Sequence, residues 1–122
     1  MRLFRFDAGV GRPIADFGSV HLLLTPIARL GGEVQIVCMH LAPGGHVGEH
    51  EAVVPQLFLV VEGAGWATGQ EATRVPIAAG RAAFWRAGER HAAGSETGMV
   101  AIVIEAETLD PSQLLVEVAG DD

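Results

Sequence analysis

Two histidines occupy similar settings in two glycine-rich stretches of the chain. His50 lies in PGGHVGEHEAVVPQLFLVVEGAGWATG (43–69), between a Pro-Gly turn and an apolar run. His91 lies in AAGRAAFWRAGERHAAG (78–94), again after a turn, a short apolar run and a glycine. An imidazole can bind a transition metal, transfer a proton or hydrogen-bond a small molecule. The pattern predicts one internal pocket marked by His50 and His91.

Other chemistries lack the residues they require. The chain has no Lys, Tyr or Asn, and all eight basic residues are Arg. Schiff-base chemistry, a phosphate-loop lysine and a tyrosine acid are therefore excluded, and no G-x-S-x-G nucleophile turn is present. The single cysteine, Cys38, has no electropositive surroundings in the sequence, so we expect a small core residue rather than a nucleophile.

The elements that position the histidines are predicted to be strands. Sixteen glycines and six prolines interrupt the chain too often for long helices. Between them lie short runs rich in β-branched and aromatic residues, typical of a sandwich or barrel. We expect strands near 2–6, 19–28, 33–41, 56–62, 65–69, 73–77, 81–85, 90–93, 98–106 and 113–118.

Strand 33–41 is apolar on both faces. Because side chains alternate along a strand, one face should carry Val34, Ile36, Cys38 and His40, and the other Gln35, Val37, Met39 and Leu41. A half-solvated strand would have one clearly polar face. We therefore expect one face to line a barrel and the other to meet a second sheet or a partner chain, which predicts a homodimer.

Size and charge narrow the function classes. The chain has 122 residues, 49% of them hydrophobic, a mean hydropathy of +0.33 and a net charge of −7. This size predicts one domain over 1–122. The acidic balance argues against nucleic acid and anionic membrane surfaces as partners. The longest apolar runs, 57–61 and 99–104, are far shorter than the roughly 20 residues of a membrane helix. The N-terminus lacks a signal-peptide pattern, so we expect a cytoplasmic protein.

The first histidine stretch resembles motif 1 of the cupin family, G-x5-H-x-H-x3/4-E-x6-G. Gly44, His50 and Gly63 fall at motif positions. Ala52 stands where the motif has its second histidine, and Gln56 stands at the glutamate. Of the three ligand positions in this motif, one keeps its histidine at His50, one is lost at Ala52 and one is replaced by an amide at Gln56.

The second stretch resembles motif 2 of the same family, G-x5-P-x-G-x2-H-x3-N. Gly80, Gly88 and His91 match, whereas Arg86 stands at the proline and Ser95 at the asparagine. The two motifs and the segment between them span 44–95, inside a motif-bearing core of 33–106. The joint spacing is more specific than either motif alone.

The resemblance implies an all-β double-stranded β-helix, or jelly-roll barrel, that is commonly dimeric. It also implies a pocket where three histidines and a glutamate hold a divalent metal. Carried over residue by residue, His50, Gln56 and His91 would hold Zn, Ni, Fe or Cu. With no carboxylate among them, the affinity for metal should fall and open positions should remain for water or substrate.

Neighbouring residues are candidates for the same pocket. His46 lies in a glycine-rich loop that could bend inward, and His40 could line the barrel. Arg86, at the pocket rim of motif 2, could clamp a carboxylate. Each of the three residue types is more often found at a surface or in packing. We expect the pocket walls to contain Ala52, Phe58, Val60 and Trp85.

Three functions fit these observations. The first is a small-molecule pocket protein, with a divalent metal at the reduced His/Gln/His site or with the two imidazoles hydrogen-bonded to each other or to Gln56. The second is a metal-dependent dioxygenase or isomerase that acts on a small organic substrate. The third is a purely structural dimerisation module, which does not account for two polar histidines on facing strands.

Overall fold

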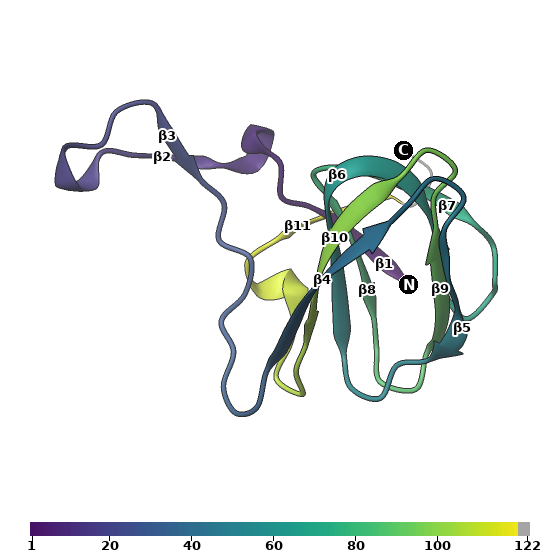
Figure 1. The fold of residues 1–122 in the computed structure, drawn as a ribbon. Coiled ribbons are helices and arrows are strands. Elements are labelled where there is room, and N and C mark those ends of the chain that lie inside the picture. The colour runs from purple at the N-terminus through teal and green to yellow at the C-terminus, as the bar shows by residue number, and fades with distance from the viewer. Residues whose placement is uncertain (120–122) are drawn as a thin grey trace.

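Strand β6 (Gln56–Thr68) belongs to two sheets. In the computed structural model, which describes residues 1–119, the first half of β6 pairs with β8 (Arg81–Trp85) and β10 (Met99–Glu105). Its second half pairs with β7 (Val75–Ala78) and β9 (Arg90–Gly94). The strand arches over one end of the molecule between the two sheets (Figure 1).

Two local features allow β6 to bend. A bulge falls at Val61, because Val100 and Ala101 of β10 pair with Glu62 and Val60. Gly63 follows with a φ of +81°, and a Cβ there would lie 2.3 Å from the Gly98 carbonyl oxygen. An extra residue bends and twists a strand, and only glycine accepts this backbone and this close approach.

Both sheets are antiparallel. The large sheet has the order β11-β1-β8-β6-β10-β4, with β1 at Arg2–Arg5, β4 at Gln35–Leu41 and β11 at Val116–Val118. The small sheet has the order β7-β6-β9-β5, with β5 at His46–Glu51. β4 and β5 are therefore edge strands, one in each sheet.

The main core fills the space between the sheets. Alternate side chains of β6 and β10 point inward, and those of β8 and β9 meet them. Its buried members are Leu3, Ala52, Phe58, Val60, Ala67, Ile77, Ala83, Trp85, Ala93, Met99, Ala101 and Val103.

A second core covers part of the outer face of the large sheet. Phe4, Leu57, Leu59 and Phe84 point outward from the sheet into it. The segments that cover them contribute Ile27, Ala28, Leu30, Ala106, Leu109 and Leu115. The large sheet is thus apolar on both faces, as the strand pattern predicts.

A hairpin arm projects from the body. β2 (Arg12–Ile14) and β3 (Leu22–Leu24) pair only with each other, and the turn between them includes the short 3-10 segment Asp16–Gly18. Figure 1 shows this arm extending away from both sheets. Two further 3-10 turns, Ala8–Val10 and Pro111–Gln113, flank the large sheet.

The all-β prediction is confirmed, because residues 1–119 contain strands and 3-10 turns but no α-helix. Several boundaries differ from expectation, and β2 at Arg12–Ile14 is not among the expected strands. The expected strand 19–28 pairs only at Leu22–Leu24, since it leaves the body and has one short partner. The segment 46–51, which is not among the expected strand ranges, is β5, and the expected strands 56–62 and 65–69 are one continuous strand.

Within residues 1–119, the structure contains no helix of the length and apolar character that a membrane crossing requires.

Gly94 is predicted to be intolerant of a side chain. A Cβ at this position would lie 2.4 Å from Trp66 Cζ2, and the Arg74 guanidinium lies over the Trp66 ring, 3.9 Å from its centroid. We expect Gly94→Ala to lower the free energy of unfolding by about 1–3 kcal/mol, the usual cost of overpacking. Chemical denaturation measures this change.

Gly48→Ala is the matched control, since Gly48 is also a strand glycine and an added Cβ would meet nothing within 4 Å. We expect a change within about 0.5 kcal/mol. Equal effects of the two substitutions would contradict the prediction.

Candidate functional site

A cavity of about 130 Å³ lies between the two sheets, next to their edge strands. It opens between β4 and β5, where Val37 and His50 are exposed. The small sheet contributes Val47, His50, His91 and Ala93. The large sheet contributes Val37, Met39, Gln56, Phe58, Trp85, Val103 and Glu105. The cavity thus brings together all three residues predicted as ligands, His50, Gln56 and His91.

Strand register sets the two histidines opposite each other. His50 of β5 pairs with His91 of β9, and their ring centroids are 4.3 Å apart. Between His50 and the next pair, Val47 with Ala93, the register shifts, so β5 is irregular beside the site. The neighbours Glu49 and Glu51 point away and form exposed ion pairs with Arg90, as strand alternation predicts.

Backbone carbonyl groups orient both imidazole rings. His50 Nδ1 lies 2.8 Å from the Gly48 carbonyl oxygen, and His91 Nδ1 lies 3.2 Å from the Glu89 carbonyl oxygen. A carbonyl only accepts, so each Nδ1 carries the hydrogen and donates it. Each ring then has Nε2 as its free nitrogen, which can accept a hydrogen bond or bind a metal.

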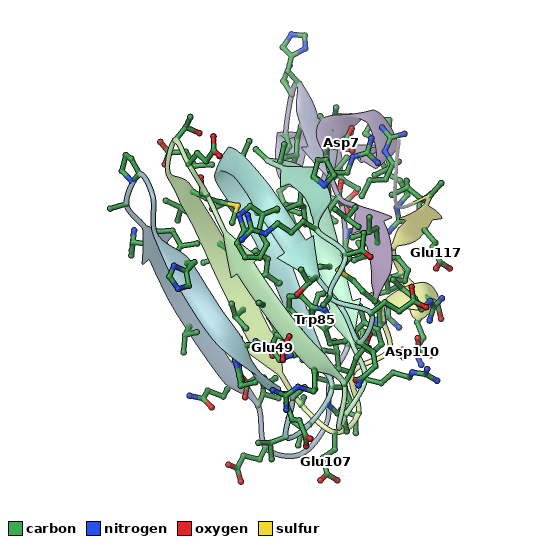
Figure 2. All side chains as sticks on the ribbon, turned by 90° about the vertical axis from the view of Figure 1, so that its right-hand side faces the viewer. Asp7, Glu49, Trp85, Glu107, Asp110 and Glu117 are labelled. Carbon is green, nitrogen blue, oxygen red and sulfur yellow. The ribbon has the colours of Figure 1, made fainter. Side chains whose placement is uncertain are left out.

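Aromatic rings form one wall of the cavity. The Trp85 ring is stacked on His91 with centroids 4.2 Å apart, and Phe58 meets Trp85 edge-on at 5.8 Å. Trp85 Nε1 donates to the Thr68 carbonyl oxygen at 2.9 Å, which fixes the indole. Figure 2 shows Trp85 within the outline of the strands, whereas Asp110 and Glu117 lie at its margin.

The two histidines differ in their access to water. His91 is only 3% exposed, whereas His50 is exposed. Burial lowers the pKa of His91 below its ordinary value, and the proximity of His50 lowers it further, while the Glu89 carbonyl oxygen opposes both effects. His91 is therefore a neutral imidazole at pH 7.

Glu105 is a cavity residue that the sequence analysis missed. It ends β10 and pairs with Gln56 of β6 across the ladder. Met99, Ala101 and Val103 on the same strand face are buried in the main core, so alternation carries the Glu105 side chain inward as well. Glu105 continues the alternation of Met99, Ala101 and Val103 just after the apolar run 99–104, and this alternation was the sequence signal that could have identified it. The site therefore has a carboxylate, on a different strand from the family position.

Two expected wall residues lie elsewhere. Ala52 is buried, but its backbone is engaged with the turn of the second motif, donating to Glu89 and accepting from Gly88. Val60 is fully buried further along β6, beside the bulge, where neighbouring side chains cover it. Neither lines the cavity, whereas Phe58 and Trp85 do.

The additional candidates point away from the cavity. His40 lies on the outer face of β4 with Cys38, and its Nε2 is 3.5 Å from the Cys38 sulfur. Both residues are exposed, so the expectation of a core cysteine is wrong. His46 is exposed at the start of β5, and Arg86 is exposed in the turn after β8. Because side chains alternate along β4, its inner face carries Val37 and Met39 instead.

The donor set does not fit the metal centre of the family. Within residues 1–119, no three His, Cys, Asp or Glu side chains lie close enough together to hold a metal ion. Zinc sites in proteins use three or four such ligands. Here the third polar group beside the two imidazoles is the neutral amide of Gln56. The Glu105 carboxylate does not form one ligand group with the two histidines.

The buried His91 makes stability depend on pH. Well above its ordinary pKa of 6.5, this residue is neutral in both the folded and the unfolded chain. As the pH falls below 6.5, His91 takes up a proton in the unfolded chain but not in the folded chain, so the free energy of unfolding decreases. We expect His91→Gln to reduce this loss, measured as thermal unfolding on either side of pH 6.5.

His46→Gln is the control for this measurement, because His46 is an exposed histidine outside the cavity. Its unfolding should follow the pH dependence of the unmodified chain. Identical pH profiles for His91→Gln and the unmodified chain would refute the assignment.

Comparison with known proteins identifies the architecture. No protein-family model and no curated protein sequence matches the chain. Among solved structures, a cupin superfamily protein from Desulfitobacterium hafniense superposes with a TM-score of 0.57 and 19% identity, covering 78% of this chain and 90% of that one. A conserved protein of unknown function from Streptococcus pyogenes gives a TM-score of 0.58 and 16% identity, covering 71% and 75%.

Salicylate 1,2-dioxygenase from Pseudoaminobacter salicylatoxidans, with gentisate adducts, also superposes. The TM-score is 0.56 at 17% identity, and the match covers 59% of this chain and 19% of that one. Such identities establish architecture and not activity. The superpositions therefore bear on the arrangement of the strands in this chain and not on its site. The chain has the cupin fold.

Proposed function

We propose that this chain binds a small organic molecule, of about one ring in size and rich in hydrogen-bond donors, in the cavity between its sheets. The observation that carries the proposal is the pair of imidazoles, His50 and His91, whose Nδ1 atoms are both committed to carbonyl groups. Their Nε2 atoms are left as acceptors beside an aromatic wall.

Cavity size limits the ligand. Its volume of about 130 Å³ is below the roughly 300 Å³ at which drug-sized pockets begin. It is similar to engineered cavities of about 150 Å³ that bind benzene. The mouth between β4 and β5 would let a substituent extend into solvent past Val37 and His50.

The polar groups favour donors on the ligand. A carboxylate only accepts hydrogen bonds, so Glu105 supports an OH or NH group, as do the two Nε2 atoms. Gln56 can accept or donate. A ligand carboxylate would instead face Glu105 with like charge, and Arg86 is not among the residues that line the cavity. Phe58 and Trp85 favour a flat apolar body between these polar ends.

Catechol tests the ligand class, with benzoate as the ring-matched anionic comparison. We expect catechol to raise the thermal midpoint and to show saturable binding by calorimetry, and benzoate to do neither. His50→Ala should weaken catechol binding about five- to tenfold, since one hydrogen bond contributes about 1 kcal/mol.

His46→Ala is the matched control on the same strand, outside the cavity, and should leave catechol affinity unchanged. Equal affinity for catechol and benzoate, or equal losses in the two variants, would overturn the proposal.

A metal-dependent dioxygenase or isomerase is the competing function, and it requires a resident metal. Two imidazoles and an amide supply no charge to balance a divalent cation, so we expect Zn, Ni, Fe or Cu to bind weakly. Elemental analysis of untagged protein should find well below one equivalent of metal. Near one equivalent, lost in both His50→Ala and His91→Ala, would contradict this expectation, and oxygen consumption with catechol would then test for the enzyme.

A further inference from the structure

A row of polar side chains crosses three strands at one end of the cavity. Gln56 at the start of β6 pairs with Glu105 at the end of β10, and Glu105 pairs with Gln35 at the start of β4. Directly paired residues of an antiparallel ladder point to the same face, so all three side chains lie on the inner face of the large sheet. The neighbouring row on this face is entirely apolar, and consists of Phe58, Val103 and Val37. The cavity therefore changes from apolar to polar at this end.

A second hollow adjoins the cavity at Glu105. It has a volume of about 420 Å³, and Glu105 lines both spaces. Its other polar lining residues are Glu33, Gln35, Glu107 and Thr108. Figure 2 shows Glu107 at the end of the strands opposite the end that carries Asp7. A molecule in the cavity can therefore extend past Glu105 into this hollow.

The two segments that border the hollow are tied to each other. Thr108 Oγ1 accepts a hydrogen bond from the Gly31 N–H and donates one to the Gly31 carbonyl oxygen, each at 3.1 Å. Gly31 lies two residues before Glu33, and Thr108 directly follows Glu107. These bonds therefore hold the two segments that carry Glu33 and Glu107 together at the rim of the hollow.

Three carboxylates face these two spaces without a cation beside them. Glu33 and Glu107 are exposed, and Glu105 is half-buried. Within residues 1–119, none of the three forms an ion pair, and no arginine lines either space. Arg29, the basic residue nearest to them in the sequence, is exposed and does not line the hollow. The hollow is therefore negatively charged and lies next to a cavity with an aromatic wall.

Gln56 is an independent sign that a ligand occupies this end of the cavity. Its side chain is 7% exposed and lines the cavity, and its amide has no hydrogen-bond partner within residues 1–119. In this part of the chain, every side-chain nitrogen or oxygen that is fully buried has a partner, so the Gln56 amide reaches open space. An enclosed amide without a protein partner is costly unless another molecule pairs with it. A ligand group beside Glu105 would supply that partner.

An ammonium group fits this arrangement better than a metal ion. No three His, Cys, Asp or Glu side chains within residues 1–119 lie close enough together to hold a metal. A primary ammonium has three N–H donors, which can be shared among separate carboxylate and amide oxygens. It therefore does not require the compact ligand group that a metal requires.

We infer that the ligand is an arylalkylamine, whose ring lies between the two sheets and whose short tail carries an ammonium group to Glu105 and the adjoining hollow. The inference rests on the proposed function and adds the charge of the ligand to it. Glu105 and Gln56 accept hydrogen bonds from the ammonium, and Glu33 and Glu107 attract it from the rim of the hollow. The same carboxylates repel a ligand with an anionic tail.

Three catechols that share a ring and differ in the tail test this inference by calorimetry at neutral pH and low salt. The tail carries an ammonium in dopamine, a hydroxyl in hydroxytyrosol and a carboxylate in homoprotocatechuate. We expect dopamine to bind about tenfold more tightly than hydroxytyrosol, because a charge-assisted hydrogen bond is stronger than a neutral one. Homoprotocatechuate should bind more weakly than either.

The ratio of the dopamine affinity to the hydroxytyrosol affinity identifies the carboxylates involved. Glu105→Gln removes the charge with little change of shape and should reduce the ratio to about two or less. Glu107→Gln should reduce the ratio by a smaller factor, about twofold, because Glu107 is exposed. Glu71→Gln is the matched control: Glu71 is exposed and lines neither space, so the ratio should stay the same.

The outcomes separate this inference from the proposed function. If neither catechol nor any of the three compounds binds, the proposed function and the inference are both overturned. If catechol binds but the three tails give equal affinities, only the inference is overturned. A tenfold ratio that persists in both Glu105→Gln and Glu107→Gln would also overturn it.

Discussion

The large sheet is apolar on both faces, and this constraint organises the rest of the molecule. Its inner face is covered by the small sheet, to which β6 connects it by bending at Val61 and Gly63. Its outer face is covered only in part, by segments on either side of Ile27 and Leu109. Burial of apolar area is the main favourable term in folding and association. A face that is only partly covered therefore affects both the stability of the fold and its association with other molecules. Coverage is incomplete at the cavity on the inner side, and around Ile36 and Val61 on the outer face.

Within the cavity, one strand pair creates two unlike histidines. His50 lies on the edge strand β5 and meets solvent, whereas His91 lies on β9 between β5 and β6 and stacks on Trp85. Burial favours the neutral form of His91, and the carbonyl partners select the same free nitrogen on both rings. The result is a pair of oriented acceptors, one accessible and one enclosed, at the mouth and floor of a single cavity.

The changed ligand positions alter what this version of the fold can do. Where the family has a second histidine, Ala52 fills space in the core and leaves its backbone to hold the turn at Gly88. Where the family has a glutamate, Gln56 keeps a polar group but no charge. The negative charge instead comes from Glu105, on the neighbouring strand of the same ladder. A carboxylate displaced to the cavity edge is better placed to contact an organic ligand than to neutralise an ion held between the imidazoles.

The sequence by itself determined the strand-rich class, the positions of most strands and the meeting of His50, Gln56 and His91. The strand-rich class and the strand positions follow from turn residues and alternation, which are local properties, and the meeting of the three residues is what the resemblance of the motif spacing to the cupin family implies. It could not decide which face of β4 turns inward, because both are apolar, and so His40 and Cys38 were left as candidates for the interior. Nor could it show that Val60 lies beyond the cavity, that Glu105 reaches it, or that residues 12–24 form an arm. These depend on the bend in β6 and on packing between distant segments, and such contacts exist only once the chain has folded.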